Sequence, residues 1–309
     1  MKKRLYRGII MGMMVLFTLI AFPRSVFAWG PSAHAYVAKM SLALEDEYVA
    51  NYNARMGSIV PDFFWYLKDL GLIDDETAYK LHGVTEEPDV VPATTYFYDI
   101  AFGNLKPWIY RLKHFTEGIR THVYADIKAH NTSNGYVEGT DMWCDFFLEQ
   151  KAAVDREALH LAIEFSVDSL LVHKYGLQLG DILFSYRQSV FMEKSVEAAF
   201  DDIGVTPDFD VSLEFKKYLA LMRVLEKTAK IYAPYLIKGA VDEALLNKLE
   251  SRELLDAERE LSDDSLDLYS DVLMILLIYP QEIHETITTK GMHWENDALP
   301  DIIDFCRPK

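Results

Sequence analysis

The chain has 309 residues, of which 50% are hydrophobic and 13% aromatic, and its formal net charge at pH 7 is −17. This composition supplies enough apolar side chains for a real core and excludes an intrinsically disordered chain. The negative charge repels nucleic acid and anionic lipid at long range, so a polyanionic substrate would need a locally positive site.

The first 28 residues have the pattern of a secretory signal peptide. A basic start (MKKRLYR) is followed by an apolar run and by small residues at Val26 and Ala28. The apolar run is shorter than the roughly 20 residues of a membrane-spanning helix, so we expect no transmembrane helix after cleavage. We predict cleavage after Ala28, a mature chain beginning at Trp29, and a secreted or periplasmic protein. Cleavage removes five basic residues and no acidic one, which changes the formal charge from −17 to −22.

Helical periodicity dominates the rest of the chain. Residues 29–309 are therefore predicted to form an all-α domain, for which a separate helical extension at 176–309 is an alternative. The first elements expected are a helix after Pro31 and a loop containing Gly57 and Pro61, which exposes Asp62 at the head of the next helix. Irregular structure is expected over 82–108, a helix over 109–129 and a surface loop over 131–139. One or two helices over 141–175 follow, and then helices broken at Gly204–Pro207, Pro234 and Pro280.

Two cysteines, Cys144 and Cys306, belong to the predicted mature chain. They could form one long-range disulfide or remain as two buried thiols, and the sequence favours neither. Because the chain has no C-x-x-C motif, a cysteine zinc site is excluded.

Histidines and carboxylates recur at helical spacing in two segments. His122, Asp126 and His130 follow one another at four-residue intervals, and His160 precedes Glu164 by four residues. Positions four apart lie on one face of a helix. Two such helices can enclose a divalent ion in nitrogen and oxygen ligands, as zinc prefers.

Four motifs resemble those of the zinc-dependent phospholipases C, which share a trinuclear zinc site with the single-strand-specific zinc nucleases. The likeness extends from residue 29 to about residue 168, and its motifs are Trp29-Gly-Pro-Ser-Ala-His34, Gly57-Ser-Ile-Val-Pro-Asp62, His122-x3-Asp126-x3-His130 and His160-x3-Glu164. The resemblance implies three zinc ions. By this resemblance, the first ion would be held by His34 and by the amino group and carbonyl of Trp29. The second would be held by Asp62, His122, Asp126 and one further histidine, with Asp126 bridging. The third would be held by His130, His160 and Glu164.

The further histidine is His82 or His114. His82 lies between Asp62 and His122 in the sequence, about where the family places this ligand, in a segment expected to be a loop. His114 lies two helical turns before His122, about 12 Å away along the axis, too far to share an ion. We therefore favour His82. We also expect Asp168 to orient His160 or His173.

The resemblance implies a hydrolase that degrades lipids. Water activated by zinc would cleave phospholipids at a membrane or micelle surface into diacylglycerol and a phosphorylated headgroup, with Asp62 as general base. We expect a monomer that binds no nucleic acid. Aromatic side chains that could receive acyl chains, or could simply form core, are Phe63, Phe64, Trp65, Tyr96, Phe97 and Tyr98.

Two other functions are compatible with the same motifs. A zinc nuclease or 3′-nucleotidase shares the Trp-Gly-x3-His spacing, although the nucleases generally have aspartate where this chain has Glu164. A helical binding protein with purely structural zinc is the third, and closed coordination without a water position would favour it. In the family that the chain resembles, the members that cleave phosphatidylcholine have an acidic residue soon after the N-terminal Trp. This chain has none within Gly30–Ala33, so the resemblance disfavours a choline headgroup.

Overall fold

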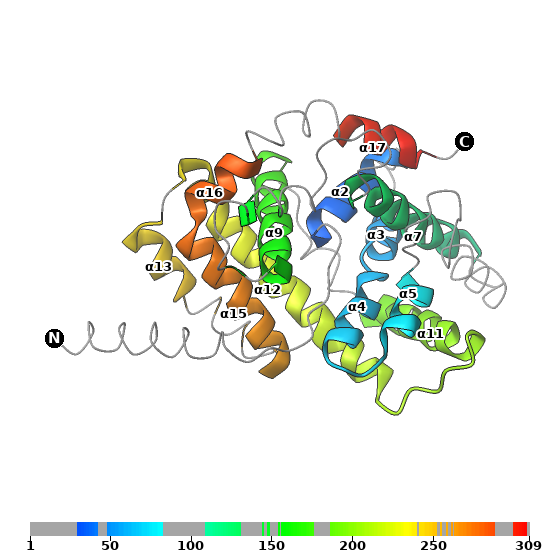
Figure 1. The fold of residues 1–309 in the computed structure, drawn as a ribbon. Helices are drawn as coiled ribbons and strands as arrows, with labels where there is room; N and C mark the ends of the chain where they lie inside the picture. The colour runs from blue at the N-terminus through cyan, green and yellow to red at the C-terminus, as the bar shows by residue number, and fades with distance from the viewer. Residues whose placement is uncertain are drawn as a thin grey trace.

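The computed structural model describes most of the chain beyond the predicted signal peptide (Figure 1). The described residues are 30–42, 48–82, 109–130, 144, 147–148, 154, 156–175, 186–239, 241–251, 254, 258, 261, 263–287 and 299–307. The predicted signal peptide, its cleavage site, Trp29, the segment expected to be irregular and the loop expected at 131–139 lie outside these residues.

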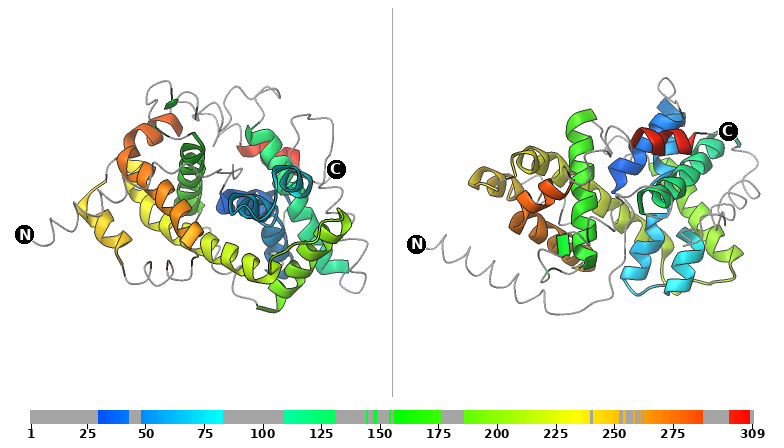
Figure 2. Two further views of the ribbon diagram at one scale, coloured as in Figure 1. Left: turned by 60° about the horizontal axis from the view of Figure 1, so that its bottom comes forward. Right: turned by 45° about the horizontal axis from the view of Figure 1, so that its top comes forward.

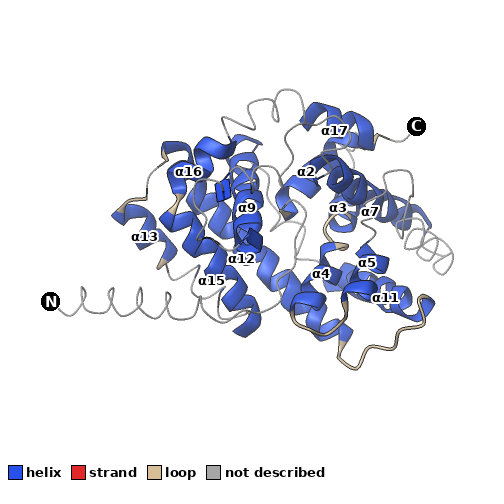
Figure 3. Ribbon diagram, viewed as in Figure 1, coloured by secondary structure: helices blue, strands red, loops and turns tan. Residues whose placement is uncertain are grey.

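Every regular element in the described part of the chain is helical, which confirms the all-α prediction (Figure 3). The helices that carry the argument are α2 (Pro31–Ser41), α3 (Tyr48–Gly57), α4 (Asp62–Asp69), α5 (Asp75–His82), α7 (Ile109–His130), α9 (Arg156–Tyr175), α11 (Tyr186–Asp202), α12 (Val211–Lys238), α13 (Glu243–Leu249), α15 (Asp263–Ile278), α16 (Pro280–Glu285) and α17 (Leu299–Cys306). None of the described helices combines the length and the apolar character that crossing a membrane requires.

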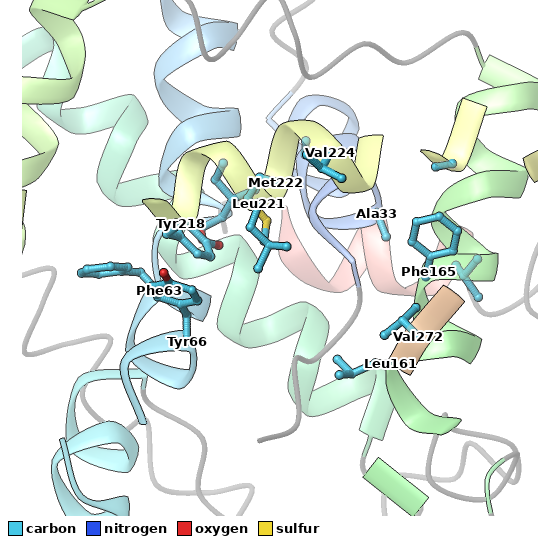
Figure 4. Close-up of a cluster of buried hydrophobic side chains, with 14 of the residues drawn as sticks. Ala33, Phe63, Tyr66, Leu161, Phe165, Tyr218, Leu221, Met222, Val224 and Val272 are labelled. Atoms are coloured by element: carbon cyan, nitrogen blue, oxygen red, sulfur yellow. The ribbon is translucent and has the colours of Figure 1, made fainter. Parts of the chain in front are cut away.

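The long helix α12 links two groups of helices. One group contains α2, α3, α7 and α17, and the other contains α9, α15 and α16, as the two views of Figure 2 show. Figure 4 shows Leu221 and Met222 of α12 between Phe63 on one side and Phe165 on the other. These residues belong to one buried apolar cluster that extends from Ala33 to Cys306. The described helices after residue 186 therefore share a core with the helices that carry the predicted ligands.

The ends of α12 follow simple local rules, but its interior does not. Asp210 caps its first turn by accepting a hydrogen bond from Leu213 N at 3.0 Å, and Gly239 ends it with a positive φ of 60°. The predicted break at Pro234 is wrong, because the helix continues through this proline to Lys238. The buried side chains of Tyr235 and Leu236 pack in the core, and this packing offsets the hydrogen bond that the proline cannot donate.

The other two predicted breaks are confirmed. Helix α11 ends at Asp202, and Gly204 adopts a φ of 72° in the turn that follows. Pro280 occupies the first position of α16, where a missing N–H costs no intrahelical hydrogen bond.

Helices α3 and α7 cross in direct backbone contact at two glycines. A Cβ on Gly57 would lie 1.9 Å from the Phe115 carbonyl oxygen, and a Cβ on Gly118 would lie 2.0 Å from the Ala54 carbonyl oxygen. Since the obstructing atoms belong to helix backbones, neither can move aside without shifting a helix. The loop that follows Gly57 leads to Asp62 and is thereby held against α7.

We predict that Gly118→Ala lowers the free energy of unfolding by at least about 3 kcal/mol, because an added methyl group must displace backbone rather than a flexible side chain. Urea denaturation followed by circular dichroism measures this loss. The matched control is Gly71→Ala, since Gly71 has a φ of 66° but no neighbouring atom within 4 Å. Its cost should be the conformational one alone, about 1–2 kcal/mol. Equal losses for the two variants would contradict the close crossing.

Candidate metal centre

Four helices bring five of the sequence-predicted ligands together. His34 comes from the first turns of α2, Asp62 begins α4, His82 ends α5, and His122 and Asp126 stand one turn apart on α7. All five side chains are buried, with at most 1% of each residue exposed. They form two groups whose ligand atoms lie within 4.8 Å of one another, and each group could hold a metal ion.

The first group consists of Asp62, His82 and His122. Asp62 Oδ1 lies 3.4 Å from His82 Nε2 and 3.6 Å from His122 Nε2. The two imidazole nitrogens are 3.0 Å apart. Three donor atoms thus converge on one small volume from three different helices.

The second group consists of His34, His122 and Asp126. Asp126 Oδ1 lies 3.2 Å from His34 Nε2, and its Oδ2 lies 3.1 Å from His122 Nε2. The same Oδ2 is 3.5 Å from His82 Nε2 in the first group. The Asp126 carboxylate therefore directs one oxygen toward each group, as a bridging ligand does.

Backbone contacts orient the central histidine. His122 Nδ1 lies 2.7 Å from the Ser58 carbonyl oxygen, so it is the protonated nitrogen that donates this bond. In the neutral ring, Nε2 then carries a lone pair and points at both carboxylates, which is the usual arrangement of a metal-binding histidine. The loop that supplies Ser58 is itself held by Tyr218 of α12, whose hydroxyl donates to the Ile59 carbonyl at 2.5 Å.

Burial makes the carboxylates of this centre costly without a cation. Desolvation raises the pKa of Asp62 well above its usual value, and the nearby charges of Asp126, Glu164 and Asp168 raise it further. A protonated acid or a bound cation relieves such a cluster of buried negative charges. The observed donor set, histidine nitrogens and carboxylate oxygens, suits a divalent transition metal. The residues present therefore fit a metal ion.

A third pair of predicted ligands lies on α9. His160 Nε2 is in contact with Glu164 Oε1 one turn later, and both residues are buried. The charge of Glu164 is one of those that raise the pKa of Asp62. The buried thiol of Cys144 interacts with His160, and neither Cys144 nor Cys306 forms a disulfide. His130 is the last residue of α7, and its side chain lies outside the described residues.

Several details of the site differ from the sequence-based expectations. His82 ends a helix instead of lying in a loop, and Asp62 is buried instead of exposed. Phe63 and Phe64 are core residues that pack against aromatic rings such as Phe215 and Phe200. Three further aromatic residues suggested for acyl chains, Tyr96, Phe97 and Tyr98, lie outside the described residues.

Asp168 does not orient a histidine as expected. Its carboxylate accepts hydrogen bonds from the backbone of α2, from Ser32 N at 2.9 Å and from Ala33 N at 2.8 Å. Burial raises the pKa of Asp168 to about 7, although these two hydrogen bonds act in the opposite direction. The four-residue spacing from Glu164 was the only sequence signal that placed it near the site.

A largely apolar pocket, partly open to solvent, lies beside Glu164 of the α9 pair. Glu164 and Asp168 are its acidic lining residues. The other lining residues are Gly30, Pro31, Leu161, Phe165, Leu221, Met222, Leu225, Tyr269 and Val272. Sequence reasoning missed this pocket, because its walls come from α2, α9, α12 and α15, which are far apart in the chain.

Comparison of the chain with models of known protein families, with characterised proteins and with solved structures found no match. The proposed function therefore rests on the geometry of the centre and on the sequence motifs.

We predict that His82→Gln weakens the binding of a divalent ion to the first group by more than about 100-fold, because it removes one of the three converging donors of that group. Competition with a chromophoric chelator, using zinc or cobalt as the probe, measures this affinity. His114→Gln is the matched control, since His114 lies two turns before His122 on α7 and belongs to neither group. An equal loss in the two variants would overturn the assignment of His82.

Proposed function

We propose that this chain is an exported, zinc-dependent phosphodiester hydrolase, and specifically a phospholipase C. The observation that carries the proposal is the pair of buried groups that share His122 and the two-sided carboxylate of Asp126. Two adjacent ion sites connected by one carboxylate suit a phosphodiester, whose oxygens can be bound from two sides. The order of the four sequence motifs supports the same class.

Zinc is the ion that we assign to the centre. The described donors are imidazole nitrogens and carboxylate oxygens without thiolate, a set that zinc accepts. His34, Asp62, His82, His122 and Asp126 would hold two ions. By the resemblance, the Trp29 amino group would complete one of these sites after export, while His130, His160 and Glu164 would hold a third ion. Bound zinc would polarise phosphate oxygens and lower the pKa of a water molecule.

The side chains of the centre would each perform a defined task in this reaction. Asp126 keeps the two groups at a constant separation, because its two oxygens contact histidines of both. His122 is fixed in one orientation by the Ser58 carbonyl. Asp62 is the general base that we propose, because its carboxylate belongs to the first group and lies 3.4 Å from His82 Nε2.

The apolar pocket favours a lipid substrate over a nucleic acid. It lies directly beside Glu164, so an apolar group bound there would be held next to the proposed third ion. A nucleic acid has no comparable apolar chain, and the strongly negative protein would repel it. The pocket is therefore the feature that supports a phospholipid as substrate.

The central test is an assay of the zinc-loaded protein that begins at Trp29. We expect it to release phosphorylated headgroups from vesicles of phosphatidylcholine, phosphatidylethanolamine or phosphatidylinositol, and to leave single-stranded DNA intact. The transfer of phosphorylated headgroup from the vesicles to the aqueous phase, and gel electrophoresis of the DNA, measure the two activities. Cleavage of DNA alone would show a nuclease, and zinc binding without turnover of any substrate would show a structural metal protein. Either result would overturn the proposal.

A second prediction tests the pocket. Leu225→Asn should lower kcat/KM for a long-chain phospholipid by about 10-fold, since a polar group would enter an apolar lining. Turnover of a short, soluble phosphodiester should stay unchanged. Leu213→Asn is the matched control on the same helix, because Leu213 is 49% exposed and lies outside the pocket. If the two variants retain equal activity on long-chain lipid, the pocket does not bind the substrate.

A further inference from the structure

The amino-terminal turn of α2 is bound by a side chain from a distant helix. Gly30, the residue before α2, provides no side-chain cap, and Pro31 and Ser32 begin the helix. The first N–H groups of the helix, those of Ser32 and Ala33, donate to the two carboxylate oxygens of Asp168, more than 130 residues later, and Ala33 N also donates to the Gly30 carbonyl at 3.0 Å. A buried carboxylate at a helix N-terminus also interacts favourably with the helix dipole.

The contact between α2 and Asp168 leaves no room for a side chain at residue 30. A Cβ on Gly30 would lie 2.3 Å from Asp168 Oδ2 and 2.8 Å from its Oδ1. Any larger residue would therefore push the carboxylate out of its position. Gly30 and Asp168 together fix the course of the backbone at the start of α2.

This contact joins two helices that each carry predicted ligands. Asp168 stands one helical turn after Glu164 on α9, so the two carboxylates share one face of that helix. At the other end of the contact, α2 carries His34, whose Nε2 lies 3.2 Å from Asp126 Oδ1 on α7. The orientation of α2 therefore decides whether His34 reaches Asp126.

We infer that Asp168 is a positioning residue that locks the first turn of α2 to α9 and thereby holds His34 at the metal centre. The inference rests on the proposed function, in which His34 and the freed amino group of Trp29 bind the same ion. Asp168 binds no metal in this role. It acts through the backbone of Ser32 and Ala33.

Asp168→Asn tests the inference, because an amide keeps the size of the side chain but replaces one acceptor by a donor. We expect the affinity of one zinc ion to fall by at least 10-fold while the other ions remain bound. Elemental analysis and chelator competition measure this. The amino group of Trp29 should react with acetic anhydride at least 10-fold faster than in the zinc-loaded wild type, as peptide mass spectrometry would show.

The matched control is Ser169→Ala on the same helix. Ser169 is buried, and its hydroxyl donates only within α9, to the Phe165 carbonyl at 2.8 Å. If this part of α9 had only a structural role, Ser169→Ala and Asp168→Asn would change thermal stability alike, and neither variant would lose one zinc ion selectively. Gly30→Ala provides a second route, because it leaves Asp168 intact but displaces its carboxylate, and it should reproduce the loss of the same ion.

Failure of the inference can be distinguished from failure of the proposed function. A wild-type protein that binds no zinc would overturn both. A wild-type protein that binds zinc and cleaves lipid, together with Asp168→Asn and Gly30→Ala variants of unchanged zinc affinity and unchanged amine reactivity, would overturn the positioning role alone.

Discussion

The metal centre depends on the backbone contact between α3 and α7. Gly118 lies one turn before His122, and Gly57 directly precedes Ser58, so the crossing that only two glycines permit determines how the loop meets α7. From this crossing follow the Ser58 hydrogen bond that orients His122 and the placement of Asp62 beside it. Tyr218 of α12 then holds the same loop from the other side. A rigid contact in the core thus holds acidic side chains close together, although their negative charges repel one another.

That repulsion is the second constraint. Asp62, Asp126, Glu164 and Asp168 are all nearly inaccessible to solvent, and burial raises the pKa of two of them. Folding alone would not gather these acids in an apolar interior unless compensating groups were present. In the described structure, each buried carboxylate has a polar partner. Histidines lie against Asp62 and Asp126, a histidine lies against Glu164, and backbone N–H groups donate to Asp168. Only the histidines leave donor atoms that a cation could share.

Apolar and polar functions meet at α9. One face of this helix presents His160, Glu164 and Asp168 to the centre, while Leu161 and Phe165 line the pocket with residues of α12 and α15. A site that joins metal ligands to an apolar cavity suits a substrate with a charged head and a hydrophobic body. The helices after residue 186 therefore contribute to the site, although none of them carries a predicted ligand.

The sequence by itself determined the helical class and several helix ends, among them the starts at Pro31, Ile109 and Pro280, because periodicity and capping residues are local properties. It also favoured His82 over His114 as the further ligand, since axial distance along one helix can be calculated, and the structure places His82 Nε2 3.4 Å from Asp62 Oδ1. Only the tertiary structure decided that α12 continues through Pro234, that Asp62 is buried, that Asp168 caps α2, and that a pocket lies beside Glu164. Each of these depends on contacts between residues far apart in the chain, and core packing can override a local signal such as a proline.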